Sequence, residues 1–205
     1  MDLPTKNAEY GTQTYWEERY SKDEGTHDWF KSYDEIKDLL DGLIPDQKSR
    51  ILMLGCGNST LSESMWQAGY KHIVNIDYSK VVIEKMQILY PDRPGMEWHV
   101  MDIRDLGFER DTFDVVIDKG TMDAMMAPVE DVWNPPQQVI DDCTKEVDEV
   151  MRVLRSSTGT FLYLTFGQPH FRKRFLTRSD AALEIKEIGD AFHYYLYILR
   201  KRAIT

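Results

Sequence analysis

Short apolar runs alternate with helical patterns along the chain from residue 50 onward. The first run, Ile51 to Leu54, ends in a glycine turn, and apolar residues at helical spacing then continue to Gly69. The same order of strand and helix recurs downstream. The further strands that this pattern predicts are 72–76, 98–101, 113–117 and 160–166. Strands that alternate with helices are typical of a mostly parallel sheet, so the chain is predicted to be an α/β protein.

Particular residues mark two of the intervening helices. Ser79 is placed to cap a helix that carries Val82, Met86 and Leu89 on one face. Residues 139–154 carry the apolar stripe of a longer helix. Both helices lie between predicted strands, as a parallel sheet requires.

The two ends of the chain depart from this order. Residues 183–188 alternate, a Gly-Asp turn follows, and 192–199 form an aromatic strand, so the chain is predicted to end in an antiparallel hairpin. Upstream of residue 50, Thr14 to Glu17 and Ser32 to Glu35 each fit a capping box, and the second opens an amphipathic helix. These N-terminal pieces are expected either over the carboxyl ends of the strands or behind the sheet.

Candidate ligand-binding residues follow three of the predicted strands. In open α/β sheets, ligands bind outside the carboxyl ends of the strands. Gly55 and Gly57 allow a tight turn and a close ligand approach, and the helix N-terminus that follows can hold a carboxylate or phosphate. Asp77 lies about 20 residues later, the offset at which an acid accepts ribose hydroxyls. Asp102 can accept the exocyclic amine of adenine beside a backbone N–H at Ile103. Together these positions predict a nucleoside cofactor.

Other interpretations of these positions are open. A glycine pair after a strand can be a simple tight turn, and an acid after a strand can cap the next helix. A nicotinamide dinucleotide site would need Gly or Ala at position 60, where this chain has Thr60, and would leave Asp102 without a role. A nucleoside other than a nicotinamide dinucleotide is therefore favoured.

Composition and charge narrow the class of protein. The chain has 205 residues, of which 42% are hydrophobic and 29% charged, which fits one globular domain and excludes a disordered, collagenous or coiled-coil chain. The net charge of −10 repels nucleic acid and favours a basic partner. The chain has two cysteines, no leader pattern and no apolar run of about 20 residues, so we expect a cytoplasmic protein that does not enter membranes. Its histidines lack ligand spacing, and no metal is expected.

Several stretches of the sequence resemble the class I S-adenosylmethionine-dependent methyltransferases. They are Leu54–Ser59, Asp77–Ser79, Met101–Ile103, Asp118–Ala124 and Gln168–Arg172. Their order more closely resembles the elongation factor 1-alpha lysine methyltransferase group, the subfamily also found beside an endothelin-converting enzyme gene. The likeness runs from about Tyr15 to Lys201, and the Asp-Lys-Gly-Thr stretch at Asp118 is specific to this group. It implies a Rossmann-like, seven-stranded methyltransferase sheet, mostly parallel, with an antiparallel C-terminal hairpin strand.

The resemblance also implies an S-adenosyl-L-methionine cofactor and its contacts. The glycine turn would pass the methionine part, the second-strand acid and the tyrosine after it would hold ribose and adenine, and the third-strand pair would hold the adenine edge. The implied cofactor-binding residues are Trp16, Tyr20, Trp29, Gly55, Gly57, Asp77, Tyr78, Asp102, Ile103 and Lys119.

The N-terminal segment has a particular place in this scheme. By similarity, Trp16, Tyr20 and Trp29 would close the cofactor pocket, with ordinary core packing as the alternative. The chain would then be one methyltransferase domain in which residues 1–48 cover a catalytic sheet of residues 49–205. Lys119 follows a buried strand and must find a carboxylate or carbonyl partner, a need that the methionine carboxylate would meet.

Methyl transfer to lysine sets one further demand. At pH 7 only about one lysine in 10³ is neutral, so the site must desolvate the amine or take its proton. We assign that work to Asp123 or His170, with Asp118 as a further carboxylate; helix capping or packing is the alternative for each. Asn134-Pro135-Pro136 lies too far after the fourth strand to hold a planar amine.

These expectations converge on a protein lysine N-methyltransferase that acts, as a monomer, on elongation factor 1-alpha. The resemblance implies this substrate. The acidic net charge agrees with it. The short connection between the fifth and sixth strands also agrees with it, because it leaves the site open to a protein. The alternatives are a small-molecule methyltransferase and a non-catalytic cofactor-binding module.

Overall fold

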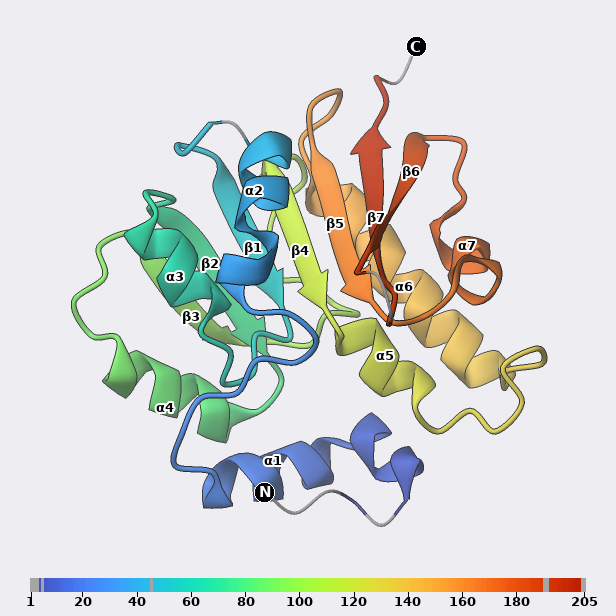
Figure 1. Ribbon diagram of the computed structural model, residues 1–205, viewed down its shortest axis with the longest axis horizontal. Coiled ribbons are helices and arrows are strands. Elements are labelled where there is room, and N and C mark those ends of the chain that lie inside the picture. Colours follow the sequence, from blue (N-terminus) through green and yellow to red (C-terminus); the bar gives the residue numbers. More distant parts are fainter. Residues whose placement is uncertain (1–3, 5, 45, 190–191, 204–205) are drawn as a thin grey trace.

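The structure is a computed structural model that describes residues 4, 6–44, 46–189 and 192–203. Its centre is a seven-stranded sheet with the strand order β3-β2-β1-β4-β5-β7-β6 (Figure 1). The strands are β1 Arg50–Leu54, β2 His72–Asp77, β3 Met96–Val100, β4 Val115–Lys119, β5 Thr160–Thr165, β6 Ala181–Ile188 and β7 Tyr194–Lys201. The helices are η1 Asn7–Gly11, α1 Gln13–Lys22, α2 Tyr33–Leu43, α3 Leu61–Gln67, α4 Lys80–Leu89, α5 Thr121–Met126, α6 Gln137–Val153 and α7 Pro169–Leu176.

The strands from β1 to β5 run parallel, and the last two form a hairpin. β1 pairs with β2 and β4, β2 with β3, and β4 with β5, all in parallel register. β7 lies antiparallel between β5 and β6, which leaves β6 at the edge of the sheet. The predicted α/β fold, with its mostly parallel sheet and antiparallel C-terminal hairpin, is confirmed.

One predicted strand begins later than expected. Phe113 lies outside β4 because its backbone pairs with the segment that follows α6: its N–H donates to Val153 at 3.0 Å, and its carbonyl accepts the N–H of Arg155 at 2.9 Å. The isolated bridge between Phe113 and Leu154 records this pairing. Apolar character at Phe113 therefore marked a buried residue and not the first residue of the strand.

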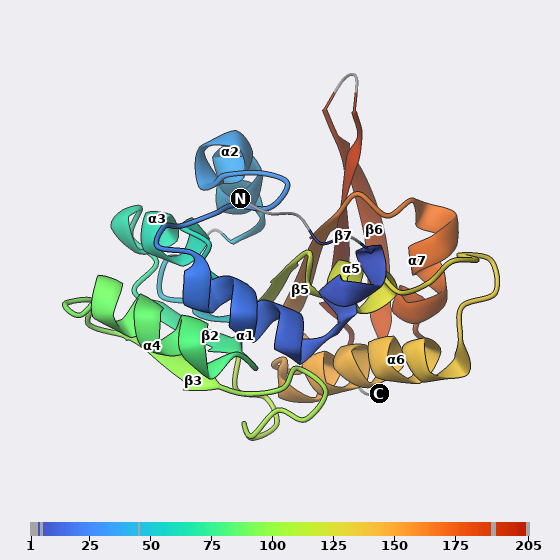
Figure 2. The same cartoon turned by 90° about the horizontal axis from the view of Figure 1, so that it is seen from below.

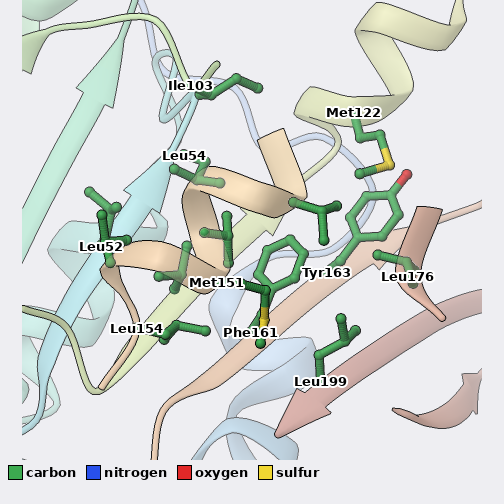
Figure 3. Close-up of a cluster of buried hydrophobic side chains, with 14 of the residues drawn as sticks. Leu52, Leu54, Ile103, Met122, Met151, Leu154, Phe161, Tyr163, Leu176 and Leu199 are labelled. Carbon is green, nitrogen blue, oxygen red and sulfur yellow. The ribbon is translucent and has the colours of Figure 1, made fainter. Parts of the chain in front are cut away.

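The central strands β1, β2, β4 and β5 are buried on both faces, which explains why they read as nearly continuous apolar runs. Successive residues of β1 point to opposite faces, so Leu52 and Leu54 enter one core and Ile51 and Met53 the other. Figure 3 shows the first core, in which α6 contributes Met151. Helices α2 and α3 cover the second.

The predicted capping box at Thr14 and Glu17 is wrong. Helix α1 begins at Gln13, and its cap is Thr12, whose side-chain hydroxyl accepts the N–H of Tyr15 at 3.3 Å. Thr12 lies two residues before the predicted cap, at the position that the start of the helix requires. Glu17 is therefore not needed for a capping box and has another partner.

That partner is the beginning of α4. Glu17 accepts hydrogen bonds from the Ser79 hydroxyl at 2.9 Å and from the Lys80 N–H at 3.1 Å. The predicted cap at Ser79 is confirmed, and so is the capping box of Ser32 and Glu35 at the start of α2. A carboxylate near a helix N-terminus is stabilising, so Glu17 ties α1 to α4.

The two N-terminal helices take the two positions that the sequence left open. α1 crosses below the carboxyl ends of the parallel strands (Figures 1 and 2), whereas α2 packs on a face of the sheet. Among the described residues, none of the helices has the length and apolar character to cross a membrane.

Candidate active site

The glycine turn after β1 forms the floor of the candidate site. Gly55 and Gly57 have φ values of 52° and 50°, which L side chains rarely adopt. A Cβ atom at Gly55 would collide with Thr121, and one at Gly57 would lie 2.7 Å from the Tyr20 hydroxyl. Only glycine fits at both positions, so the predicted tight turn is confirmed, and the close approach to a ligand stays a prediction.

A cavity of about 410 Å³ lies between this turn and α1, at the carboxyl ends of the central strands. This volume is typical of small-molecule and cofactor sites. The cavity is lined from the sheet side by the residues after β1, β2, β3 and β4, and from the other side by η1, α1, His27, Trp29 and Phe30. The lining includes Trp16, Tyr20, Trp29, Gly55, Gly57, Asp77, Tyr78, Asp102, Ile103 and Lys119. The structure therefore brings together every residue predicted to contact the cofactor.

Asp77 is a buried carboxylate at the end of β2. It accepts the N–H of Gly57 at 3.0 Å and the N–H of Ser79 at 2.9 Å, so it holds the glycine turn and the start of α4 in place. Burial raises its pKa to about 6, although both hydrogen bonds lower it. Each carboxylate oxygen keeps acceptor capacity for a further donor.

Asp102 follows β3 and is paired with a residue that the sequence did not single out. Arg104 donates from Nη2 at 2.7 Å and from Nε at 3.0 Å to the two oxygens of Asp102, and its Nη1 lies 3.1 Å from Asp142 on α6. Burial raises the pKa of Asp102, but the hydrogen bonds and charge of Arg104 bring it below its ordinary value. Asp102 therefore stays ionised at neutral pH.

The N-terminal aromatic residues both pack in a core and line the cavity. The Trp16 and Tyr20 rings stack with centroids 5.5 Å apart, and the Arg19 guanidinium lies 5.1 Å from the Trp29 ring. Trp16 and Tyr20 also contact Val82 and other apolar residues of α4. The two sequence interpretations, pocket closure and core packing, are thus not exclusive for these side chains.

Lys119 finds its partners within the chain. Its Nζ donates to Asp28 at 3.1 Å and to the carbonyl of Trp29 at 2.9 Å. This confirms the need for a carboxylate or carbonyl partner, but Asp28 supplies it. Asp28 also accepts the hydroxyls of Ser59 and Thr60, directly before α3, so one of the chain's own carboxylates lies beside this helix N-terminus.

The pKa values of this ion pair reflect burial and mutual attraction. Burial lowers the pKa of Lys119, while the neighbouring Asp28 raises it. Burial raises the pKa of Asp28, but the donors Ser59, Thr60 and Lys119 lower it by more. The pKa of Asp28 is therefore below its ordinary value. No sequence signal marked Asp28, because it lies in an irregular segment and its partners are far along the chain.

The structure does not bring Asp123 and His170 together at the cavity. Asp123 lines it, but its oxygens accept hydrogen bonds from Tyr163 at 2.9 Å, Thr165 at 2.6 Å and Arg172 at 2.9 Å. His170 is exposed on α7, where its ring stacks on Trp133 at 5.3 Å.

Asp118 is also held by other groups. It is fully buried at the end of β4 and accepts the N–H groups of Thr121 and Met122, at 2.7 Å and 2.9 Å, at the start of α5. This geometry gives Asp118 a capping role, and it gives Asp123 a place in a buried network.

Comparisons with known proteins show which enzymes this chain resembles. Residues 51–156 match the family described as a methyltransferase domain. The mouse protein named EEF1A lysine methyltransferase 4 is 38% identical over 100% of this chain and 81% of its own length. The mouse eEF1A lysine and N-terminal methyltransferase is 37% identical over 84% of this chain and 24% of its own length. The fold is shared with the N-methyltransferase NodS of Bradyrhizobium japonicum, solved with S-adenosyl-L-homocysteine, with a TM-score of 0.67 and 15% identity over 90% of this chain and 96% of NodS.

Proposed function

The chain belongs to the S-adenosylmethionine-dependent methyltransferases and, within them, to the family of the EEF1A lysine methyltransferases, and we propose that it methylates a lysine of translation elongation factor 1-alpha. The observation that carries this proposal is the convergence of Gly57, Asp77, Asp102 and Lys119 on one cavity in a chain with these relatives. Bound S-adenosyl-L-methionine supplies an electrophilic methyl group, and the chain's task is to orient and desolvate the acceptor.

The cavity residues fit such a cofactor. We assign the ribose hydroxyls to Asp77, whose oxygens keep free acceptor capacity, and the adenine to Tyr78, Ile103 and the ionised Asp102. The glycine turn leaves space for the methionine part. Lys119 uses two of its three N–H donors on Asp28 and Trp29, which leaves one for a carboxylate of the ligand.

The same assignment gives the N-terminal segment its role. We propose that residues 1–48 form a single domain with the sheet of residues 49–205, and that the part of them from η1 to Phe30 closes the cofactor site, while α2 packs on the sheet. The support is that Trp16, Tyr20 and Trp29 contribute lining side chains and that Asp28 and Glu17 fix this segment to β4 and α4.

We assign the deprotonation of the acceptor lysine to its desolvation in the cavity, which favours the neutral amine. Asp77, Asp102 and Asp123 line the cavity, and each is hydrogen-bonded to other groups of the chain. Much of the remaining lining is apolar, including Met125 and Phe166, and burial in such surroundings lowers the pKa of an amine. We therefore give Asp123 a positioning role and place His170 outside the reacting centre.

We further propose that the protein acts in the cytoplasm as a monomer on a basic protein surface. Its net charge of −10 would steer a basic partner and repel nucleic acid.

Incubation with radiolabelled S-adenosylmethionine tests this function. We expect label on purified elongation factor 1-alpha, and one labelled band in a cell lysate. The initial rate should fall as salt rises from 0.1 M to 1 M, because the Debye length shrinks from about 10 Å to about 3 Å. Label in a low-mass fraction would instead indicate a small-molecule methyltransferase, and no label at all a non-catalytic cofactor-binding module.

Cofactor affinity should depend on pH through Asp77. Its pKa of about 6 in the free protein means that it is ionised above pH 6 and protonated below. Ribose hydroxyls favour the ionised acceptor, so affinity for S-adenosylhomocysteine should be nearly full at pH 7 and above, about half at pH 6 and about tenfold lower at pH 5. Calorimetry between pH 5 and pH 8 measures this dependence.

The control for this experiment is Asp77→Asn, which keeps the shape of the side chain and cannot titrate. Its affinity should be weak and nearly constant over the same range. A wild-type affinity that does not change between pH 5 and pH 8 would remove the ribose role from Asp77.

A further inference from the structure

Exposed aromatic side chains gather on one side of the cavity mouth. Trp133 is 67% exposed and Phe192 63%, and Phe166 is also exposed. The exposed aliphatic residues Ile88 and Val100 lie instead on α4 and β3, and β3 is the opposite edge of the sheet from β6. The aromatic exposure is therefore a local feature of the β5–β7 side.

The first group of these side chains surrounds Phe30. Its ring lies 5.5 Å from that of Phe166 and 5.6 Å from that of Tyr194, and Phe192 lies 5.1 Å from Tyr194. The Lys31 ammonium is 5.3 Å from the Tyr194 ring, so this group already accepts a cation over an aromatic face.

The second group is centred on Trp133. Its ring stacks on His170 at 5.3 Å and meets Phe171 edge-on at 4.9 Å. The backbone beside it is held by Asp131, which accepts the N–H of Trp133 at 3.0 Å and the Asn134 side chain at 2.9 Å. The indole is thus presented to solvent by a turn with its own hydrogen bonds, as a preorganised anchor would be.

Both groups are continuous with the cavity. Phe30 and Phe166 from the first group line it, as does Val132 next to Trp133. The short segment from Phe166 to Phe171 runs from the end of β5 into the start of α7 and joins the two groups. We call these residues the aromatic rim: Phe30, Val132, Trp133, Phe166, His170, Phe171, Phe192 and Tyr194.

We propose that the aromatic rim binds the segment of the acceptor protein that carries the methylated lysine. This inference rests on the proposed function, and it names the surface that recognises the substrate. Any lysine that enters the cavity from this side must bring its neighbouring residues across the rim. The chemistry favours a basic segment, because aromatic faces bind Lys and Arg side chains as well as apolar ones, and because Glu130 and Asp131 are exposed beside Trp133.

Two substitutions test the rim, one in each group: Trp133→Ala and Phe192→Ala. Both side chains are largely exposed and neither lines the cavity, so folding and cofactor binding should persist. We expect the KM for elongation factor 1-alpha to rise about tenfold in each variant, because exposed aromatic anchors of this kind dominate protein interfaces. The kcat at saturating acceptor and the affinity for S-adenosylhomocysteine should stay at wild-type values.

The matched control is Ile88→Ala, which removes a side chain that is 79% exposed at the other side of the sheet. Its KM should equal that of the wild type. Wild-type KM values in both rim variants would overturn the proposal and leave the proposed function intact. A wild-type protein that does not methylate elongation factor 1-alpha would remove both. Sedimentation that shows a dimer dissociated by Trp133→Ala would assign the rim to a second copy of the chain, and would also overturn it.

Discussion

Replacement of Arg172 with methionine should lower the free energy of unfolding by about 3–5 kcal/mol, because it leaves a buried carboxylate without its counter-charge. The side chains of Arg172 and Asp123 are 6% and 5% exposed, and the guanidinium also donates from Nε to the Tyr163 hydroxyl at 3.0 Å. Methionine preserves much of the volume, so the loss reports the pair and not a cavity. Urea unfolding monitored by circular dichroism measures it.

The control for this prediction is the double variant Asp123→Asn with Arg172→Met. Removal of both charges leaves no unpaired ion, so the double variant should regain a large part of the stability lost in Arg172→Met. A loss below about 1 kcal/mol in the single variant would show that Asp123 is adequately satisfied by Tyr163 and Thr165 alone.

Replacement of Asp28 with alanine should cost about 3 kcal/mol of stability and weaken S-adenosylhomocysteine binding at least tenfold. Asp28 holds Lys119, Ser59 and Thr60, and it anchors the segment that brings Trp29 to the cavity. Without it, the Lys119 ammonium is left buried against one carbonyl. Urea unfolding and calorimetry measure the two effects.

The paired control is Asp28→Asn with Lys119→Met, which removes both charges and keeps an acceptor oxygen for one hydroxyl and an amide that can donate to the other. It should recover stability relative to Asp28→Ala. Cofactor affinity should remain low in this double variant, because its donor at position 119 is lost. An Asp28→Ala protein with wild-type stability and affinity would contradict the anchoring role.

Local patterns in the sequence were enough to predict the sheet and the glycine turn. Alternation of strands and helices gave the α/β fold, and Gly55 and Gly57 marked a turn that tolerates no side chain. Asp77 and Asp102 were found because each follows directly on a predicted strand, and parallel strands end at a common edge. In the structure Asp77 is the last residue of β2, and Asp102 lies two residues after the end of β3. These signals depend on residues close together in the chain.

Contacts between distant segments were not predicted. Glu17 matched a capping box at its own helix, but it accepts hydrogen bonds from the start of α4, 62 and 63 residues further along the chain. Asp28 and Arg104 gave no periodic or motif signal. Asp28 pairs with Lys119, and Arg104 pairs with Asp102. Asp123 was recognised as important, but only the fold shows that Arg172, Tyr163 and Thr165 surround it.

The central claim is that this chain transfers a methyl group from S-adenosylmethionine to a lysine side chain of elongation factor 1-alpha. Mass spectrometry of the purified factor, after incubation with the wild-type protein and in parallel with Asp77→Ala, tests it most directly. We predict added methyl mass on the side chain of a single lysine with the wild-type protein, and none with Asp77→Ala under the same conditions. Methyl mass on an arginine, a glutamine or the terminal amine, or an unmodified factor, would contradict the claim.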